Sequence, residues 1–190
     1  RIIAGRDINI TADRIISENA KIDAGRDVIL NTVSSIENTN SVITAKRRMS
    51  IDANSLTNKS SSITATNAKS DLNVTNYITN DANSVISSGR GLNITSARLT
   101  NAGKIISPTN VPNTVPTPTY ESNINVKDID NKGGFIAGDK LSITSDFIYN
   151  DQGFIDAKTL DINANYLNNN GGYIRSYNNM ALNTHQLNNY

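Results

Sequence analysis

Two acidic and two basic side chains in a repeated Gly-Arg-Asp phrase are the residues with the clearest potential for chemistry. The phrase occurs once with Arg6 and Asp7 and again, one repeat later, with Arg26 and Asp27. Neighbouring carboxylates beside an arginine are what a polysaccharide lyase or hydrolase uses for proton transfer. The same alternation suits a surface ladder in which arginines neutralise aspartates, and we favour this second interpretation.

The other polar residues form no catalytic motif. The single histidine, His185, is predicted to be a solvated side chain in a turn. The sequence contains no HExxH motif, phosphate-binding loop or calcium-binding nonapeptide. It also has no cysteine, which excludes disulfides and thiolate metal sites. We therefore expect a protein that is not an enzyme, with no catalytic residue, cofactor or metal site.

Composition argues against two classes of partner. The net charge is +1, and no basic stripe with interleaved aromatic residues is present, so we expect no nucleic-acid binding. No apolar run approaches 18 residues, so the chain is not expected to span a membrane. Because the sequence begins in the middle of a repeat, we expect it to be a piece of a longer protein.

The fold that must position these side chains is set by a sequence repeat. Each segment opens with an isoleucine followed, two positions later, by Gly, Ala or Ser. The isoleucines are Ile3, Ile22, Ile43, Ile63, Ile86, Ile105, Ile136, Ile155 and Ile174. A period of roughly 20 residues is typical of solenoids, in which each unit buries its apolar face against its neighbours.

Two further phrases describe the rest of each repeat. The first alternates apolar and polar residues with period two, as in Val28–Leu30, which is typical of a β-strand with one buried face. The second is Leu or Ile, any residue, then Asn, as in Leu56–Asn58; the first repeat departs from it with Ile16–Glu18. Asparagine suits a tight left-handed corner, and stacked asparagines can form a ladder along the axis.

These patterns predict an all-β fold, a right-handed parallel β-helix of about nine coils. Each coil should contain three short strands and add one rung of about 4.8 Å. The right-handed sense follows from the general preference of parallel crossovers.

One repeat is interrupted. We expect residues 1–190 to form a single segment in which a loop at 107–123 divides coils 1–106 from coils 124–190. All four prolines lie in this insertion, where they prevent regular strand pairing. The residues that could contact a partner there are Pro108, Pro112, Pro116, Pro118 and Tyr120. Loops on rigid scaffolds often carry binding function, but we favour the interpretation that the insertion is a tolerated surface loop or a junction between two blocks of repeats.

Aromatic residues concentrate after the insertion. Phe135, Phe154 and Tyr173 each precede a leading isoleucine and follow one another at intervals of one repeat. They should form a column on the outer face of three coils. Such a column can grip sugar rings or a partner protein, or it can simply shield the adjacent turns.

The repeats resemble a known family. The phrases IAGRDINITADRI, IDAGRDVILNTVSSIEN and GGFIAGDKLSITSDFIYNDQGFIDA are similar to the haemagglutinin repeats of filamentous-haemagglutinin-like exoproteins. These are the large secreted partners of bacterial two-partner secretion systems. The resemblance covers the chain except residues 107–123, and the family's repeats have no catalytic residues to carry over.

The resemblance implies export through an outer-membrane two-partner transporter to the bacterial cell surface. It also implies one of two roles, as an adhesin or as the stalk of a contact-dependent growth-inhibition toxin. The expected function is an internal rod segment that projects a distal binding or toxin region. A receptor- or glycan-binding module, acting through the loop at 108–120 or the aromatic column, is the alternative; a polysaccharide-cleaving enzyme is a further one.

Overall fold

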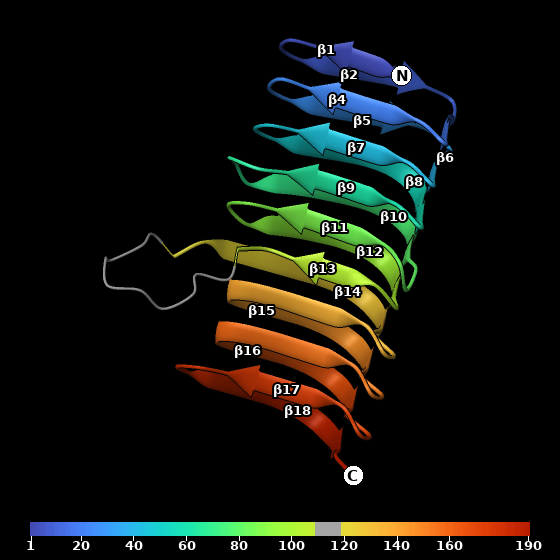
Figure 1. Ribbon diagram of the computed structural model, residues 1–190. Coiled ribbons are helices and arrows are strands. Elements are labelled where there is room, and N and C mark those ends of the chain that lie inside the picture. Colours follow the sequence, from blue (N-terminus) through green and yellow to red (C-terminus); the bar gives the residue numbers. More distant parts are fainter. Residues whose placement is uncertain (109–118) are drawn as a thin grey trace.

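The chain winds into one stack of β-strand coils (Figure 1). The computed structural model describes residues 1–108 and 119–190, and the described residues contain strands and turns but no helix. The first six coils contain β1 (Ile2–Ala4), β2 (Ile8–Ala12), β3 (Ile15–Glu18), β4 (Lys21–Ala24), β5 (Val28–Thr32), β6 (Ser35–Thr39), β7 (Val42–Ala45), β8 (Met49–Lys59), β9 (Ser62–Ala65), β10 (Ser70–Asn80), β11 (Val85–Ser88), β12 (Leu92–Asn101), β13 (Lys104–Ile106) and β14 (Glu121–Asp130). The last three contain β15 (Phe135–Tyr149), β16 (Phe154–Asn168), β17 (Tyr173–Ser176) and β18 (Met180–Asn188).

Each described strand pairs in parallel with the equivalent strands of the neighbouring coils, and the strands of the first and last coils pair on one side only. For example, β8 pairs with β5 and β6 on one side and with β10 on the other. In Figure 1 the front strands run from right to left as the chain descends from the N-terminus, which makes the coil right-handed. The predicted right-handed parallel β-helix of about nine coils is confirmed.

The expected three strands per coil are seen only at the N-terminal end. From the third coil onward the second and third strands are continuous, as in β8, and in β15 and β16 all three are joined. The chain bends at these corners while keeping its ladder of hydrogen bonds. In the sixth coil β13 ends at Ile106, and β14 begins at Glu121.

The first and third strands of the first coil are shifted by one residue from the predicted register, whereas its second strand pairs as predicted. Ile2, rather than Ile3, pairs with Ile22, and Ile15, rather than Ile16, pairs with Ile36. Each site has two consecutive isoleucines, so the apolar pattern fits either alignment. Ile16 is exposed and Ile15 is buried, because a shift of one residue in a strand moves a side chain to the other face. Ile2 and Ile3 are both exposed in the first coil.

The interior is aliphatic except for one polar column. Asparagines at the end of each coil point inward and are almost fully buried, from Asn38 to Asn169. Each side-chain Nδ2 donates to the Oδ1 of the next asparagine at 2.7–2.9 Å, so the predicted ladder is confirmed. In most coils Nδ2 also donates to a backbone carbonyl three residues further along, as from Asn150 to Gly153 at 3.1 Å.

The predicted reason for asparagine at the corner was wrong. The left-handed residues lie two positions beyond the ladder asparagines, and include Asn40, Gly133, Gln152 and Gly171. The ladder asparagines themselves have ordinary backbone angles. Asparagine is therefore explained at these positions by its buried side-chain amide, which both donates and accepts a hydrogen bond, and not by its tolerance of a left-handed backbone.

Candidate functional site

The Gly-Arg-Asp phrases form a charged ladder on one edge of the solenoid. Arg26 donates to both carboxylate oxygens of Asp7 at 2.8 and 2.6 Å, and Arg47 pairs with Asp27 in the same way. The backbone N–H of Asp27 also donates to Asp7 at 3.2 Å. The predicted neighbours are therefore confirmed, and each aspartate is held by the arginine of the following coil.

These contacts fix the ionisation of the two carboxylates. The hydrogen bond from Arg26 lowers the pKa of Asp7, and the hydrogen bond from Arg47 lowers the pKa of Asp27. A general acid must instead hold its proton near neutral pH, which requires a raised pKa. The ladder is suited to joining successive coils and not to acid catalysis.

The predicted loop is anchored by the coil that follows it. Its first stem, next to Pro108, donates from the Ser107 N–H to the Ala137 carbonyl at 2.9 Å. Its second stem donates from the Tyr120 N–H to the carboxylate of Asp139 at 3.0 Å, and Asp139 is fully buried. Gly138 allows this approach, because an added Cβ would lie 2.8 Å from the Ser107 Oγ.

Of the predicted partner-contacting residues in the loop, Pro108 and Tyr120 are partly buried at its base. Pro112, Pro116 and Pro118 lie outside the described residues, so their role stays a prediction.

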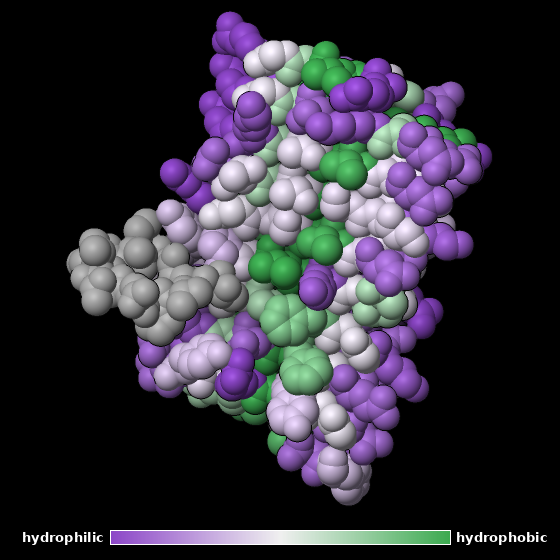
Figure 2. Space-filling view, viewed as in Figure 1, coloured by the Kyte–Doolittle hydropathy of each residue, from purple (hydrophilic) through white to green (hydrophobic). Residues whose placement is uncertain are grey.

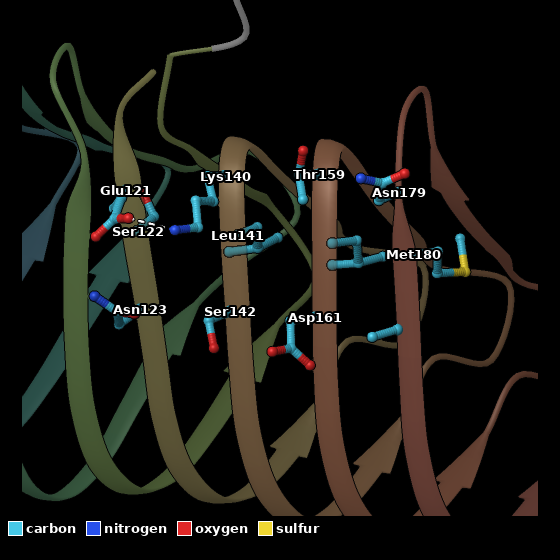
Figure 3. Close-up of a pocket in the computed structure, with 12 residues that line it drawn as sticks. Glu121, Ser122, Asn123, Lys140, Leu141, Ser142, Thr159, Asp161, Asn179 and Met180 are labelled. Atoms are coloured by element: carbon cyan, nitrogen blue, oxygen red, sulfur yellow. Dashed lines mark hydrogen bonds and ion pairs between the residues drawn. The ribbon is translucent and has the colours of Figure 1, made fainter. Parts of the chain in front are cut away.

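A groove of about 430 Å³, lined by both polar and apolar side chains, runs beside the second stem across four coils (Figure 3). Glu121 and Lys140 form an ion pair at its rim, and the interaction with Lys140 lowers the pKa of Glu121. In Figure 3, Ser142 on β15 and Asp161 on β16 lie side by side. The groove offers hydrogen-bonding groups from successive coils, and in the part of the chain that the structure describes Ser142 and Asp161 are not joined by a hydrogen bond.

The predicted aromatic column is present. Phe154 pairs in register with Phe135 and Tyr173. The ring centroids are 6.4 Å apart between Phe135 and Phe154, and 5.0 Å apart between Phe154 and Tyr173, whose planes are almost parallel. Phe154 is 43% exposed and Tyr173 64%. The rings pack on one another and remain open to solvent, and a binding role for them stays a prediction.

Apolar side chains also gather at the molecular surface. Figure 2 shows them as a band that runs along one face of the solenoid, with hydrophilic side chains on both flanks. The band crosses several coils, so the outer surface is not uniformly polar along its length.

A second aromatic cluster was missed in the sequence. Phe147 and Tyr149 on β15 flank Tyr166 on β16, with centroid distances of 6.4 and 5.7 Å. The signal was present, because Phe147 and Tyr166 are also one repeat apart in the sequence. This cluster lies at the end of the coil and not directly before a leading isoleucine.

Other chemistry is sparse in the described residues. His185 is exposed, as expected, but it lies within β18 and not in a turn. Within residues 1–108 and 119–190 no three His, Asp or Glu side chains gather where a metal ion could bind. Over the same residues there is no helix of the length and hydrophobicity needed to cross a membrane.

The repeats of this chain match a known protein family. The haemagglutinin-repeat family matches residues 1–76, 53–111 and 128–189. The chain belongs to the haemagglutinin-repeat family. The resemblance to filamentous-haemagglutinin-like exoproteins is therefore confirmed. A search of curated proteins and a search of solved structures each gave no match.

Membership of the haemagglutinin-repeat family gives the general character of the chain. The family is a structural and adhesin family, and its members are secreted surface exoproteins and substrates of two-partner secretion. Together with the β-helix, these repeats identify a rod-like, adhesin-like segment.

Proposed function

We propose that this chain is a rod segment of a bacterial surface exoprotein, which projects a distal adhesive or toxin region away from the cell. The observation that carries the proposal is the unbroken ladder of amide hydrogen bonds from Asn38 to Asn189. With the parallel strands, it joins each coil to the next by the same set of contacts.

This construction suits a spacer. In a solenoid each coil contacts only its neighbours, so length is gained by adding coils while the cross-section stays constant. Each coil adds about 4.8 Å of reach. Export through a two-partner transporter and a position on the bacterial cell surface are parts of the same proposal. An adhesin and a contact-dependent inhibition protein would use the segment in the same way.

Recognition by the segment itself is the second candidate. Its support is the exposed column of Phe135, Phe154 and Tyr173, together with the loop whose stems are held by Ser107 and Asp139. In this case a receptor or glycan on a target cell would contact the column or residues 108–120.

One experiment separates the two candidates. Binding of the purified chain to epithelial and bacterial cells is compared with two variants, one with residues 108–120 replaced by a short turn and one with F154A and Y173A. A passive rod predicts that all three fold as β-structure and that none binds through these sites. Binding that is lost in either variant would contradict the passive rod and assign recognition to that feature.

A further inference from the structure

A hollow on another face of the solenoid combines aromatic rings with charged groups of both signs. Its volume is about 510 Å³. It is lined by Arg98 from β12, by Asp128 and Asp130 from β14, and by Phe147 and Tyr149 from β15. We call it the β14–β15 hollow. Its walls come from strands of three successive coils, so its shape is set by the solenoid itself and not by a loop.

The rings of the β14–β15 hollow are fixed but open. Phe147 is 42% exposed and Tyr149 is 40% exposed. Both pack against Tyr166, whose hydroxyl accepts a hydrogen bond from the Asn188 side chain at 2.9 Å. A ring that is held in place before a ligand arrives loses little conformational freedom on binding.

The charged side chains of the β14–β15 hollow make almost no ion pairs or hydrogen bonds with the rest of the described chain. Among the described residues, Arg98, Asp128 and Asp130 form no ion pair, and the only hydrogen bond to either carboxylate comes from the Lys132 N–H to Asp130 at 3.2 Å. Other aspartates on the surface, such as Asp7, are paired with an arginine of the following coil. The hollow therefore keeps one guanidinium and two carboxylates available for a ligand.

The register places each carboxylate beside a ring. Asp128 pairs with Phe147, and Asp130 pairs with Tyr149, on the neighbouring strand. The backbones are therefore one rung apart, about 4.8 Å. A ligand that lies over the rings can reach the carboxylates with groups at its edge.

We propose that the β14–β15 hollow binds a neutral pyranose unit of a surface glycan. The C–H face of such a sugar stacks on an aromatic ring, whose face carries partial negative charge. Its hydroxyls donate to Asp128 or Asp130, and its oxygens accept from Arg98. The proposal concerns a different surface from the loop and from the Phe135–Tyr173 column, and it holds whether or not the rod carries a distal domain.

The charges of the hollow select against other ligands. Two carboxylates outnumber one guanidinium, so an anionic sugar is disfavoured. A cation would be attracted by the carboxylates and rings but opposed by Arg98. A purely apolar partner would strip water from three charges without replacing their hydrogen bonds. A neutral ligand with many hydroxyls satisfies donors and acceptors together.

The test is a glycan array carrying glucan, galactan and mannan oligosaccharides beside sialylated and uronic-acid counterparts. The chain is compared with F147A/Y149A and with D128N/D130N. Tyr77→Ala is the matched control, because Tyr77 is 46% exposed on the same outward row and pairs in register with Arg98. Thermal unfolding of each variant shows that the fold is retained.

The expected result is retention on at least one neutral oligosaccharide, weakened at least about tenfold in both double variants and unchanged in Y77A. Epithelial cells and bacteria are then tested separately, which identifies the source of the glycan. The proposal is overturned if no neutral oligosaccharide is retained, if only anionic glycans bind, or if Y77A is weakened equally.

Discussion

The buried amide ladder makes a specific prediction about Asn80. Its Nδ2 donates to the Asn101 Oδ1 at 2.8 Å and to the Lys104 carbonyl at 3.2 Å, and its Oδ1 accepts from Asn58 at 2.9 Å. Asn80 has no exposed surface. Replacement by alanine removes all three contacts in the middle of the stack.

The loss of stability in N80A can be estimated from the polar groups that the substitution leaves without a partner. The Asn101 Oδ1 loses its donor and stays buried, which costs about 1–3 kcal/mol. The missing amide also leaves a small cavity and breaks the remaining bonds, for about 1 kcal/mol more. We therefore expect N80A to lower the free energy of unfolding by about 2–4 kcal/mol.

The chain provides a matched control. Asn76 donates to the Asn54 Oδ1 at 2.9 Å, which is also an amide contact between coils, but it is exposed. N76A should change the free energy of unfolding by no more than about 0.5 kcal/mol. Urea unfolding followed by circular dichroism gives both values. Equal effects of N80A and N76A would refute the reasoning that burial makes the ladder stabilising.

Three further changes test other parts of the structure. Ser17 occupies the ladder position of the first coil, and neither its Oγ nor the Asn38 Oδ1 has a partner in the described structure, so S17N should add about 1 kcal/mol to the free energy of unfolding measured in urea. The hydrogen bond from Arg47 lowers the pKa of Asp27, so this pair stabilises the fold at neutral pH, and the contribution is lost as the pH falls below the ordinary aspartate pKa of about 3.9. D27N should therefore reduce the difference between the urea midpoints at pH 7 and pH 3. An unchanged difference would exclude the pair as a source of acid sensitivity. An added Cβ at Gly134 would lie 2.1 Å from a backbone oxygen of the coil before it, so G134A should cost about 1–3 kcal/mol in thermal or urea unfolding, and a neutral effect would show that the corner can relax.

Much of the fold was accessible from the sequence because its signals repeat. Period-two alternation assigns residues such as Val28 and Leu30 to the interior, and the asparagine phrase predicts the ladder. The first coil was misaligned because Ile2 and Ile3 fit the apolar pattern equally well. The two alignments differ only in which isoleucine pairs with Ile22 of the next coil, and the sequence of one repeat does not specify this pairing.

The candidate sites were predicted less completely. The Phe135 column was found because its spacing coincides with the leading isoleucines, whereas the β14–β15 hollow joins different residue types from different coils. Arg98, Asp128 and Phe147 share one outward row, although their residue types do not repeat. Such a site can be recognised only when the strands of successive coils are aligned in register. The sixth coil makes this alignment difficult from the sequence, because it is longer than the others and changes the spacing between equivalent residues.

The central claim, that the coils stack in parallel register to form a rod, is tested most directly by distances between spin labels. The chain has no cysteine, so two introduced cysteines would be its only thiols. One outward row of paired residues contains Glu37, Asp130 and Asn168. Along this row Asp130 lies four rungs from Glu37, and Asn168 lies six rungs from Glu37. The account predicts backbone separations of about 19 Å for E37C/D130C and about 29 Å for E37C/N168C. Broad distributions, or distances that do not increase by about 10 Å between the two pairs, would contradict it.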